Sequence, residues 1–360
     1  MKLQLKFGLI LSTISLLAYS SFANAETKVI ASIKPLHSLV SYVMDGVGKP
    51  SILVDGSASP HTFQLKPSHA EMLQEADIVF WIGEDLESFL ETPLESIAVN
   101  SKHIELIKSD EIELLKFREK NIFGEHDDHD EHEGHDDHDE HEDEHGHDEH
   151  EDENGHEEHE DEHGHEEHDD HDEHEGHDDH DEHEGHDDHA HHHGEFDIHF
   201  WLDPEIAKTI VNITAKELSE IDPANKSTYE SNAQDAIYDL NQLIDNTSAK
   251  INSDASYVVF HDAYQYFEQR FGIEVVGALT VNPEVLPGAK QLAEIREVIE
   301  HEEVNCLFTE PQFNPSIAET IASDTGVKSA VLDPLGAELE PGKDLYFELI
   351  GDMAISFEDC

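Results

Sequence analysis

Apolar and polar positions follow two different rhythms along most of this chain. Short apolar runs predict strands, and amphipathic stretches between them predict helices. We expect strands at 28–33, 51–54, 76–82, 256–260, 273–279, 304–309 and 328–332. We expect helices at 67–76, 204–221, 223–251, 263–271, 288–301 and 315–325. Strands and helices that alternate in this way are typical of parallel sheets with helical layers, so the pattern predicts an α/β fold with two lobes.

The rhythm is interrupted from Gly124 to Gly194, where imidazole and carboxylate side chains alternate. This tract contains 24 of the 31 histidines and 37 of the 85 acidic residues, but no Lys or Arg. The unit "HDDHDEHEG" recurs, and histidines fall mainly at every third residue, which fits neither a helical stripe nor a strand. A segment with so few apolar residues cannot bury enough surface to offset the entropy of ordering. We therefore predict a disordered surface loop inserted in the first lobe.

The charge of the chain limits the classes of ligand. The net charge is −65, and the residues outside the tract still include 48 acidic side chains against 20 basic ones. Such a field repels nucleic acid and phosphate and attracts cations. A metal ion suits it.

The N-terminus predicts export. Two lysines precede a short apolar run that ends in Ala23-Asn24-Ala25, the pattern of a secretory signal peptide at 1–25 with cleavage near Ala25. No later stretch reaches the ~18 apolar residues that a membrane-spanning helix needs. In an oxidising compartment the two cysteines, Cys306 and Cys360, most simply form a disulfide, worth roughly 4 kcal/mol in the chain-entropy model. The alternative, a pair of metal thiolates, has no CxxC spacing to support it.

Candidate ligands follow the predicted strands. Ligands of parallel α/β sheets bind outside the carboxyl ends of the strands, and His61, His199, His261, Glu310 and Asp333 lie after apolar runs or, for His199, just past the tract. Three imidazoles and two carboxylates at one edge are suitable zinc ligands. Against this, a single histidine at a strand end is more often structural, spacing alone does not show that the three converge, and Glu310 has the alternative roles of helix cap or partner of a ligand histidine.

Four other histidines have no such placement. They lie in helical or connecting contexts, and we interpret them as structural: His37, His69, His103 and His301.

Several phrases of the sequence resemble one protein family. They are "SPHTFQLKPS", "ADIVFWIGEDLE", "IHFWLDP", "DPANKSTYESNAQD", "VVFHDAYQYFEQRFGI", "LFTEPQF" and "LDPLG", and they span the mature chain in order. The chain is thereby similar to the zinc-specific solute-binding proteins of ABC transporters, the ZnuA family. The resemblance implies two α/β lobes at 26–222 and 251–360, joined by one long rigid helix at 223–250, with the metal between the lobes.

The resemblance also implies the roles of individual residues. His61, His199 and His261 match the zinc ligands of the family, and Asp333 matches a carboxylate that ligates manganese in related proteins. Some zinc members place a Glu directly before the first His, where this chain has Pro60, so the fourth ligand is either Asp333 or water. Cys306 and Cys360 match a disulfide known in some members.

These features predict a monomeric periplasmic protein that binds Zn²⁺ and delivers it to an ABC-transporter membrane permease. The alternatives are a manganese-binding relative, a zinc hydrolase with Glu310 as base, and a metal buffer or sensor in which the tract is the whole function. For the tract we favour weak accessory zinc binding over the role of a solvated spacer. Its candidate ligands include His126, His129, His132, His135, His138, His141, His145, His147, His191, His192 and His193.

Overall fold

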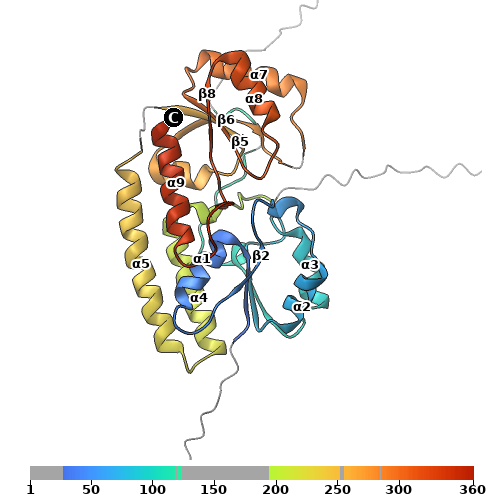
Figure 1. Ribbon diagram of the computed structural model, residues 1–360, viewed down its shortest axis with the longest axis vertical. Helices are drawn as coiled ribbons and strands as arrows, with labels where there is room; N and C mark the ends of the chain where they lie inside the picture. The colour runs from blue at the N-terminus through green and yellow to red at the C-terminus, as the bar shows by residue number, and fades with distance from the viewer. Residues whose placement is uncertain (1–26, 119, 124–193, 252–254, 284) are drawn as a thin grey trace, which may run out of the picture. The chain divides into compact units, whose positions relative to one another are not determined.

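The computed structural model describes residues 27–118, 120–123, 194–251, 255–283 and 285–360. The predicted signal peptide and the histidines of the tract, His126 to His193, lie outside these ranges. The described part contains two sheets, one in each lobe, and Figure 1 shows them with the helices around them.

The first lobe is built on a four-stranded parallel sheet with strand order β2-β1-β3-β4. Every residue of the two inner strands is buried, which explains their continuous apolar runs. Helix α1 covers one face, and α2 and α3 lie on the other (Figure 1). The elements are β1 (Val29–Ile33), α1 (Lys34–Val43), β2 (Ser51–Val54), α2 (Pro67–Glu75), β3 (Ile78–Trp81), α3 (Glu91–Ser96) and β4 (Lys102–Glu105), with 3₁₀ helices η1 (Pro60–Thr62), η2 (Ser88–Leu90) and η3 (Leu106–Lys108).

The second lobe repeats this topology in the order β6-β5-β7-β8, again with parallel strands throughout. Side chains of β5 alternate between two apolar layers. Val258 and Phe260 pack with α7 and α8, whereas Tyr257 packs on Phe308 and Phe357. The elements are β5 (Ser256–His261), α6 (Gln265–Phe271), β6 (Glu274–Thr280), α7 (Ala289–His301), β7 (Cys306–Thr309), α8 (Ser316–Thr325), β8 (Lys328–Val331) and α9 (Leu345–Asp359).

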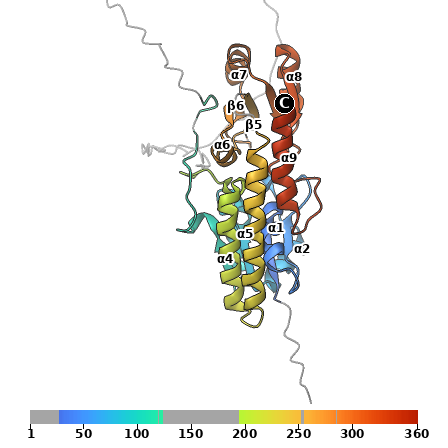
Figure 2. The same ribbon diagram turned by 90° about the vertical axis from the view of Figure 1, so that its left-hand side faces the viewer.

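Two helices lie between the sheets in sequence, α4 (Pro204–Ile221) and α5 (Lys226–Ser248), after the short η4 (Phe200–Leu202). Asp203 caps α4 by accepting a hydrogen bond from the backbone N–H of Glu205, as its Asp-Pro start suggests. The second Asp-Pro pair does not start α5, because residues 223–225 form a turn and the helix begins three residues later than expected. Figure 2 shows α4 and α5 packed side by side along most of their length.

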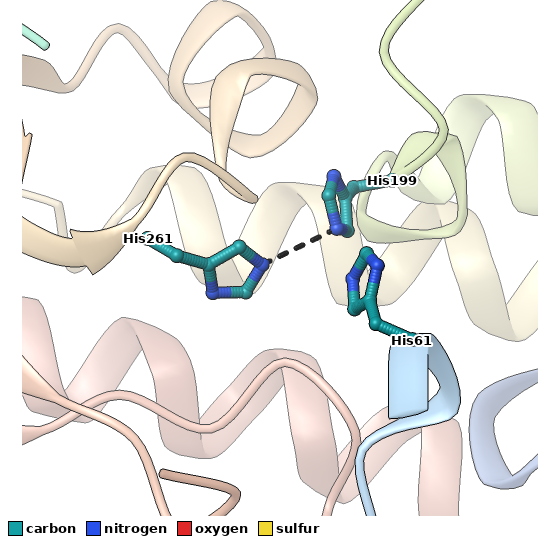
Figure 3. A group of neighbouring side chains, drawn as sticks. All are labelled: His61, His199 and His261. Carbon is teal, nitrogen blue, oxygen red and sulfur yellow. Dashed lines mark hydrogen bonds between the residues drawn. The ribbon is translucent and has the colours of Figure 1, made fainter. Parts of the chain in front are cut away.

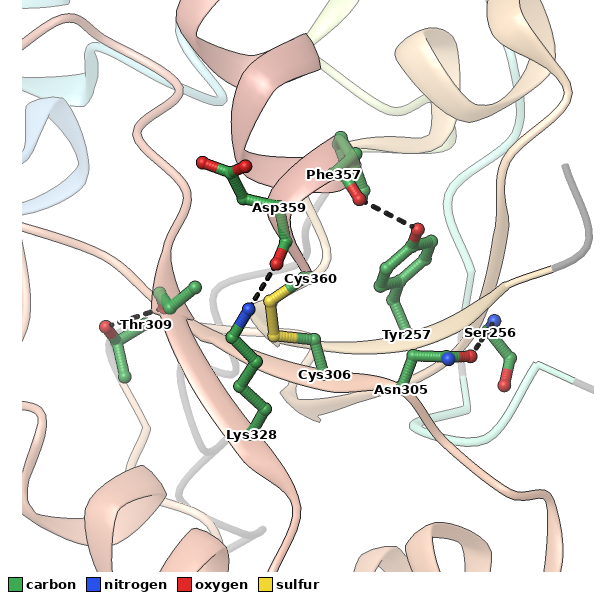
Figure 4. Close-up of a disulfide and its surroundings, with 10 residues drawn as sticks. Ser256, Tyr257, Asn305, Cys306, Thr309, Lys328, Phe357, Asp359 and Cys360 are labelled. Carbon is green, nitrogen blue, oxygen red and sulfur yellow. Dashed lines mark hydrogen bonds between the residues drawn. A yellow bond between two sulfur atoms is a disulfide. The ribbon is translucent and has the colours of Figure 1, made fainter. Parts of the chain in front are cut away.

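The sequence analysis expected one joining helix, but α9 shares this role. Near its start the backbone N–H of Tyr346 donates to Ser38 Oγ of α1, and the helix packs on α1 and α5. At its other end Phe357 O accepts a hydrogen bond from Tyr257 of the second sheet. The predicted disulfide is confirmed: Cys360 is bonded to Cys306 of β7 (Figure 4). Helix α9 therefore belongs to both lobes.

The two flanks of the insertion pair with each other before they reach the metal-ligand candidates. Lys116 and Phe196 form an antiparallel bridge, and Ile122 pairs with Gly277 on edge strand β6. Gly277 permits this close approach, since a Cβ there would lie 2.8 Å from Asn121 O. The pairing with Lys116 anchors the segment that leads to His199, and the pairing of Ile122 with β6 anchors the other flank on the second sheet.

Candidate metal centre

Three histidines from distant parts of the sequence meet at one point (Figure 3). His61 lies in η1 just after β2, His199 precedes η4, and His261 is the last residue of β5. One ring nitrogen from each lies within 4.8 Å of the others, and this is the group of possible metal ligands found within the described residues. The structure thus brings together the three isolated histidines that sequence reasoning selected.

Local structure positions each imidazole. Pro60 opens η1 and fixes the backbone just before His61. The bridge at Phe196 and a hydrogen bond from Asp197 N to Leu115 O, 2.8 Å long, hold the segment that leads to His199. His261 is 3% exposed and continues the buried strand β5 directly.

Two of the rings are oriented by buried carboxylates. His199 Nδ1 lies 2.8 Å from Asp197 Oδ1, and His261 Nδ1 lies 2.7 Å from Glu310 Oε1. These contacts leave Nε2 of each ring facing the other, 3.4 Å apart (dashed in Figure 3). A ligand histidine that donates its other N–H to a carboxylate is fixed in tautomer and orientation and becomes a stronger donor to the metal. The arrangement is therefore that of a prepared metal site.

The site has room for one ion. Its cavity of about 10 Å³ is lined by the three histidines and by Trp201, Glu310, Gln312 and Phe313, among others. This is about the space of one water-sized sphere. Trp201 packs against His199 and Phe313 against His261, with ring centroids 5.2 and 5.5 Å apart. An organic ligand does not fit, whereas a single metal ion does.

Buried charges surround the site. Burial by itself lowers the pKa of His261, but the charge and hydrogen bond of Glu310 more than offset this, and its pKa lies above the ordinary value of 6.5. Burial raises the pKa of Asp197 to about 6 and that of Asp262 to about 6. Arg118 pairs with Asp262 at 2.6 Å and with Glu268 at 2.8 Å. The acidic surroundings favour a bound cation.

Asp333, which with water was one of the two candidates for the fourth ligand, is not in the histidine group. Its carboxylate accepts hydrogen bonds from the backbone N–H groups of Leu335 and Gly336, both 3.0 Å long, and of Ala337. Gln312 Nε2 donates a fourth, 2.8 Å long. Glu310, by contrast, contacts His261, which agrees with its expected role as the partner of a ligand histidine.

The four histidines interpreted as structural lie outside the group. His37 Nε2 contacts Pro50 O at 3.1 Å, His103 Nε2 contacts Ala98 O at 2.9 Å, and His69 Nδ1 accepts a hydrogen bond from Lys66 N. His301 is exposed at the end of α7.

Sequence reasoning missed Asp197 and Gln312. Asp197 carried a usable signal, because it stands two residues before a candidate ligand in "FDIHFW". Gln312 follows Glu310 by two residues, but an amide in a loop attracts no notice on composition alone.

Comparison with known proteins identifies the family. The family model for the periplasmic component A of zinc-uptake complexes, ZnuA, matches residues 29–360. The chain belongs to this family.

Curated relatives agree with this assignment, and a solved structure shares the fold. The high-affinity zinc uptake system protein ZnuA of Brucella abortus is 43% identical over 343 residues, covering 95% of this chain and 93% of the relative. The protein of the same name from Haemophilus influenzae is 43% identical over 352 residues, covering 96% of each. A crystal structure of ZnuA shares the fold, with a TM-score of 0.65 at 20% identity over 93% of this chain and 99% of that one.

Family membership decides between several of the alternatives. The chain is a component of a periplasmic zinc-uptake system and a binding protein rather than an enzyme, so the hydrolase interpretation is set aside. Within the described residues, the cluster of His61, His199 and His261 is the group that could hold a metal ion. In the part of the chain that the structure describes, no helix has the length and apolar composition to cross a membrane.

Proposed function

We propose that this chain captures Zn²⁺ in the periplasm with three imidazole ligands and hands it to the membrane permease of an ABC transporter. The observation that carries the proposal is the convergence of His61, His199 and His261 on a cavity with room for one ion. Two of the rings are already held by buried carboxylates, so little ordering is left to do when the ion arrives.

The donor set favours zinc over manganese. Neutral imidazoles suit the borderline-soft Zn²⁺, whereas Mn²⁺ prefers more oxygen ligands. Asp333 is the carboxylate that would favour manganese if it bound the metal. Its two oxygens, however, already accept hydrogen bonds from four N–H donors. We therefore assign the fourth coordination position to water and Asp333 to a supporting role.

The origin of the ligands supports the proposed delivery to the permease. His61 belongs to the first lobe and His261 to the second, so a partner that docks across both lobes can change the distance between them. We expect the protein to act as a monomer after cleavage near Ala25. Intact mass and sedimentation of the exported protein test these two points, and zinc-dependent stimulation of permease ATPase activity tests the docking.

The tract from 124 to 194 we assign an accessory role, in which clustered imidazoles collect zinc weakly and reversibly. Its composition supports this, since the 24 histidines supply many candidate ligands. Deletion of 124–194 separates this role from that of a buffer. A transport component keeps one tight zinc ion after the deletion, whereas a buffer loses its binding.

The main site is tested by His261→Ala, with the exposed His301→Ala as matched control. Competition with a chromophoric zinc chelator reports the tight site in the presence of the weak ones. Structural zinc sites with four ligands bind with roughly 10 to 16 kcal/mol, so loss of one ligand should weaken binding by about 3 kcal/mol, or about 100-fold. Tight binding retained by His261→Ala would contradict the proposal.

A further inference from the structure

Gln312 is a half-buried residue beside the metal site, and only one end of its side-chain amide has a hydrogen-bond partner among the described residues. It lines the same cavity as the three histidines and follows Glu310 by two residues in the loop after β7. Its Nε2 donates to Asp333 Oδ1 at 2.8 Å. Its Oε1 is buried and has no hydrogen-bond partner among the described residues.

The orientation of this amide is fixed by its neighbour. Asp333 offers only acceptor oxygens when ionised, and three backbone N–H groups already hold its carboxylate in place. Turning the Gln312 amide over would set oxygen against oxygen, so the NH₂ group belongs to Asp333 and the carbonyl oxygen points elsewhere. Burying an acceptor without a donor is unfavourable, which calls for a donor that arrives with the ligand.

The donor can be identified from the chemistry of the site. The histidine nitrogens that face the cavity must offer their lone pairs to the metal, so they cannot act as the donor. In His199 and His261 the other ring nitrogen, Nδ1, already contacts a carboxylate. A zinc ion held by three imidazoles completes its tetrahedron with one more ligand. If that ligand is water, it brings two O–H donors to the cavity that Gln312 lines.

We propose that Gln312 positions the fourth zinc ligand: its Oε1 accepts a hydrogen bond from the zinc-bound water, while its Nε2 holds Asp333 away from the metal. This inference rests on the proposed function and adds a residue to it. Gln312 is thus a positioning residue that keeps the fourth position exchangeable, since a water leaves more readily than a carboxylate.

The test uses the full chain with Gln312→Leu, which keeps the volume and removes both the donor and the acceptor. Gln234→Leu, on the exposed surface of α5, is the matched control. Zinc affinity is measured by chelator competition, and the visible spectrum of the protein with less than one equivalent of Co²⁺ reports the coordination of the tight site. Loss of a group that orients a metal ligand typically weakens binding 10- to 100-fold.

We expect Gln312→Leu to weaken zinc binding at least 10-fold and to shift the Co²⁺ bands, while Gln234→Leu changes neither. Asp333→Asn should weaken binding less than Gln312→Leu, because the aspartate is not a ligand. Unchanged affinity and spectrum in Gln312→Leu would overturn the inference. Tighter zinc binding in Gln312→Leu would also overturn it. The same holds for a loss of zinc affinity in Asp333→Asn as large as that in His261→Ala, since either result would indicate that Asp333 is the ligand.

Two further measurements keep the outcome decisive. If Gln312→Leu does not fold, Gln312→Met removes the same two groups with a more flexible side chain and replaces it. Wild-type protein that fails to bind one zinc ion tightly, or binds it independently of His261, contradicts the proposed function itself. A failure confined to the Gln312 variants contradicts only the inference.

Discussion

The two sheets have the same topology, but the crevice at the carboxyl ends of their central strands holds different residues in each. In each, the connection after the first strand and the connection after the third strand run to opposite sides of the sheet, so a crevice opens between these two strands at their carboxyl ends. In the second sheet this point holds His261, at the end of β5, and Glu310, just after β7. In the first sheet the corresponding point holds Ser32 of β1 and Glu87, which follows β3.

The first crevice is closed by its own side chains. Glu87 is fully buried and accepts hydrogen bonds from Ser32 Oγ and from the backbone N–H groups of Ile82 and Gly83. Burial raises the pKa of Glu87 to about 7. In the second crevice the buried Glu310 instead orients an imidazole whose far side stays open to the cavity. A topological binding point becomes a site only if the residue placed there leaves a coordinating atom unused.

The largest expected difference between the lobes concerns the disulfide, which fastens only the second sheet. Cys306→Ser with Cys360→Ser should lower the free energy of unfolding by about 4 kcal/mol in the chain-entropy model, given a separation of 54 residues. Urea unfolding measures the loss, and hydrogen exchange should show it in β5 to β8 before β1 to β3. Reduced wild-type protein should match the double variant. Equal loss of protection in both sheets would mean that the lobes do not differ in this way.

The next effect concerns Glu87, whose raised pKa makes stability depend on pH. A carboxyl group with a folded-state pKa of about 7 and an ordinary value of 4.5 stabilises the fold fully below pH 4.5, and this contribution is lost as the pH rises to about 7. Glu87→Gln cannot ionise, and its amide can accept from the backbone and donate to Ser32. It should therefore be more stable than wild type at pH 8, by up to roughly 3 kcal/mol, and equal to it near pH 4.5.

Urea unfolding of the zinc-free protein at several pH values measures this difference. Glu75→Gln, an exposed carboxylate on α2, is the control and should not raise stability at pH 8. A Glu87→Gln variant that is less stable at pH 8 would show that the ionised carboxylate holds the crevice closed, contrary to the pKa argument.

The smallest effect comes from the equivalent change in the second crevice. Glu310→Gln keeps an acceptor for His261 but removes its charge, so zinc binding should weaken by about 10- to 100-fold. Asp197→Asn should do the same through His199. Chelator competition measures both, with Glu87→Gln as the matched control that leaves zinc affinity unchanged. Equal weakening in all three variants would indicate a general loss of packing rather than a role at the metal.

Particular elements show how far sequence reasoning reached. The strand at 51–54 and the helix at 204–221 were predicted to the residue, because continuous apolar runs and an Asp-Pro start are local signals. Helix α9 was not predicted, and its place between the lobes depends on partners on α1 and α5 that are remote in sequence. Asp333 stood at a strand end as a ligand would, yet its carboxylate is occupied by the turn that follows it.

Local patterns along the chain are enough to predict the two α/β lobes and the strand ends at which candidate ligands appear. These features depend on the local periodicity of apolar positions and on short-range turn chemistry, which a linear pattern records. The convergence of His61, His199 and His261 is seen only in the folded chain, as is the placement of Asp197, Glu310 and Gln312 beside them. Convergence depends on how two sheets pack and on how the flanks of an insertion pair, and those contacts join residues that no local pattern links.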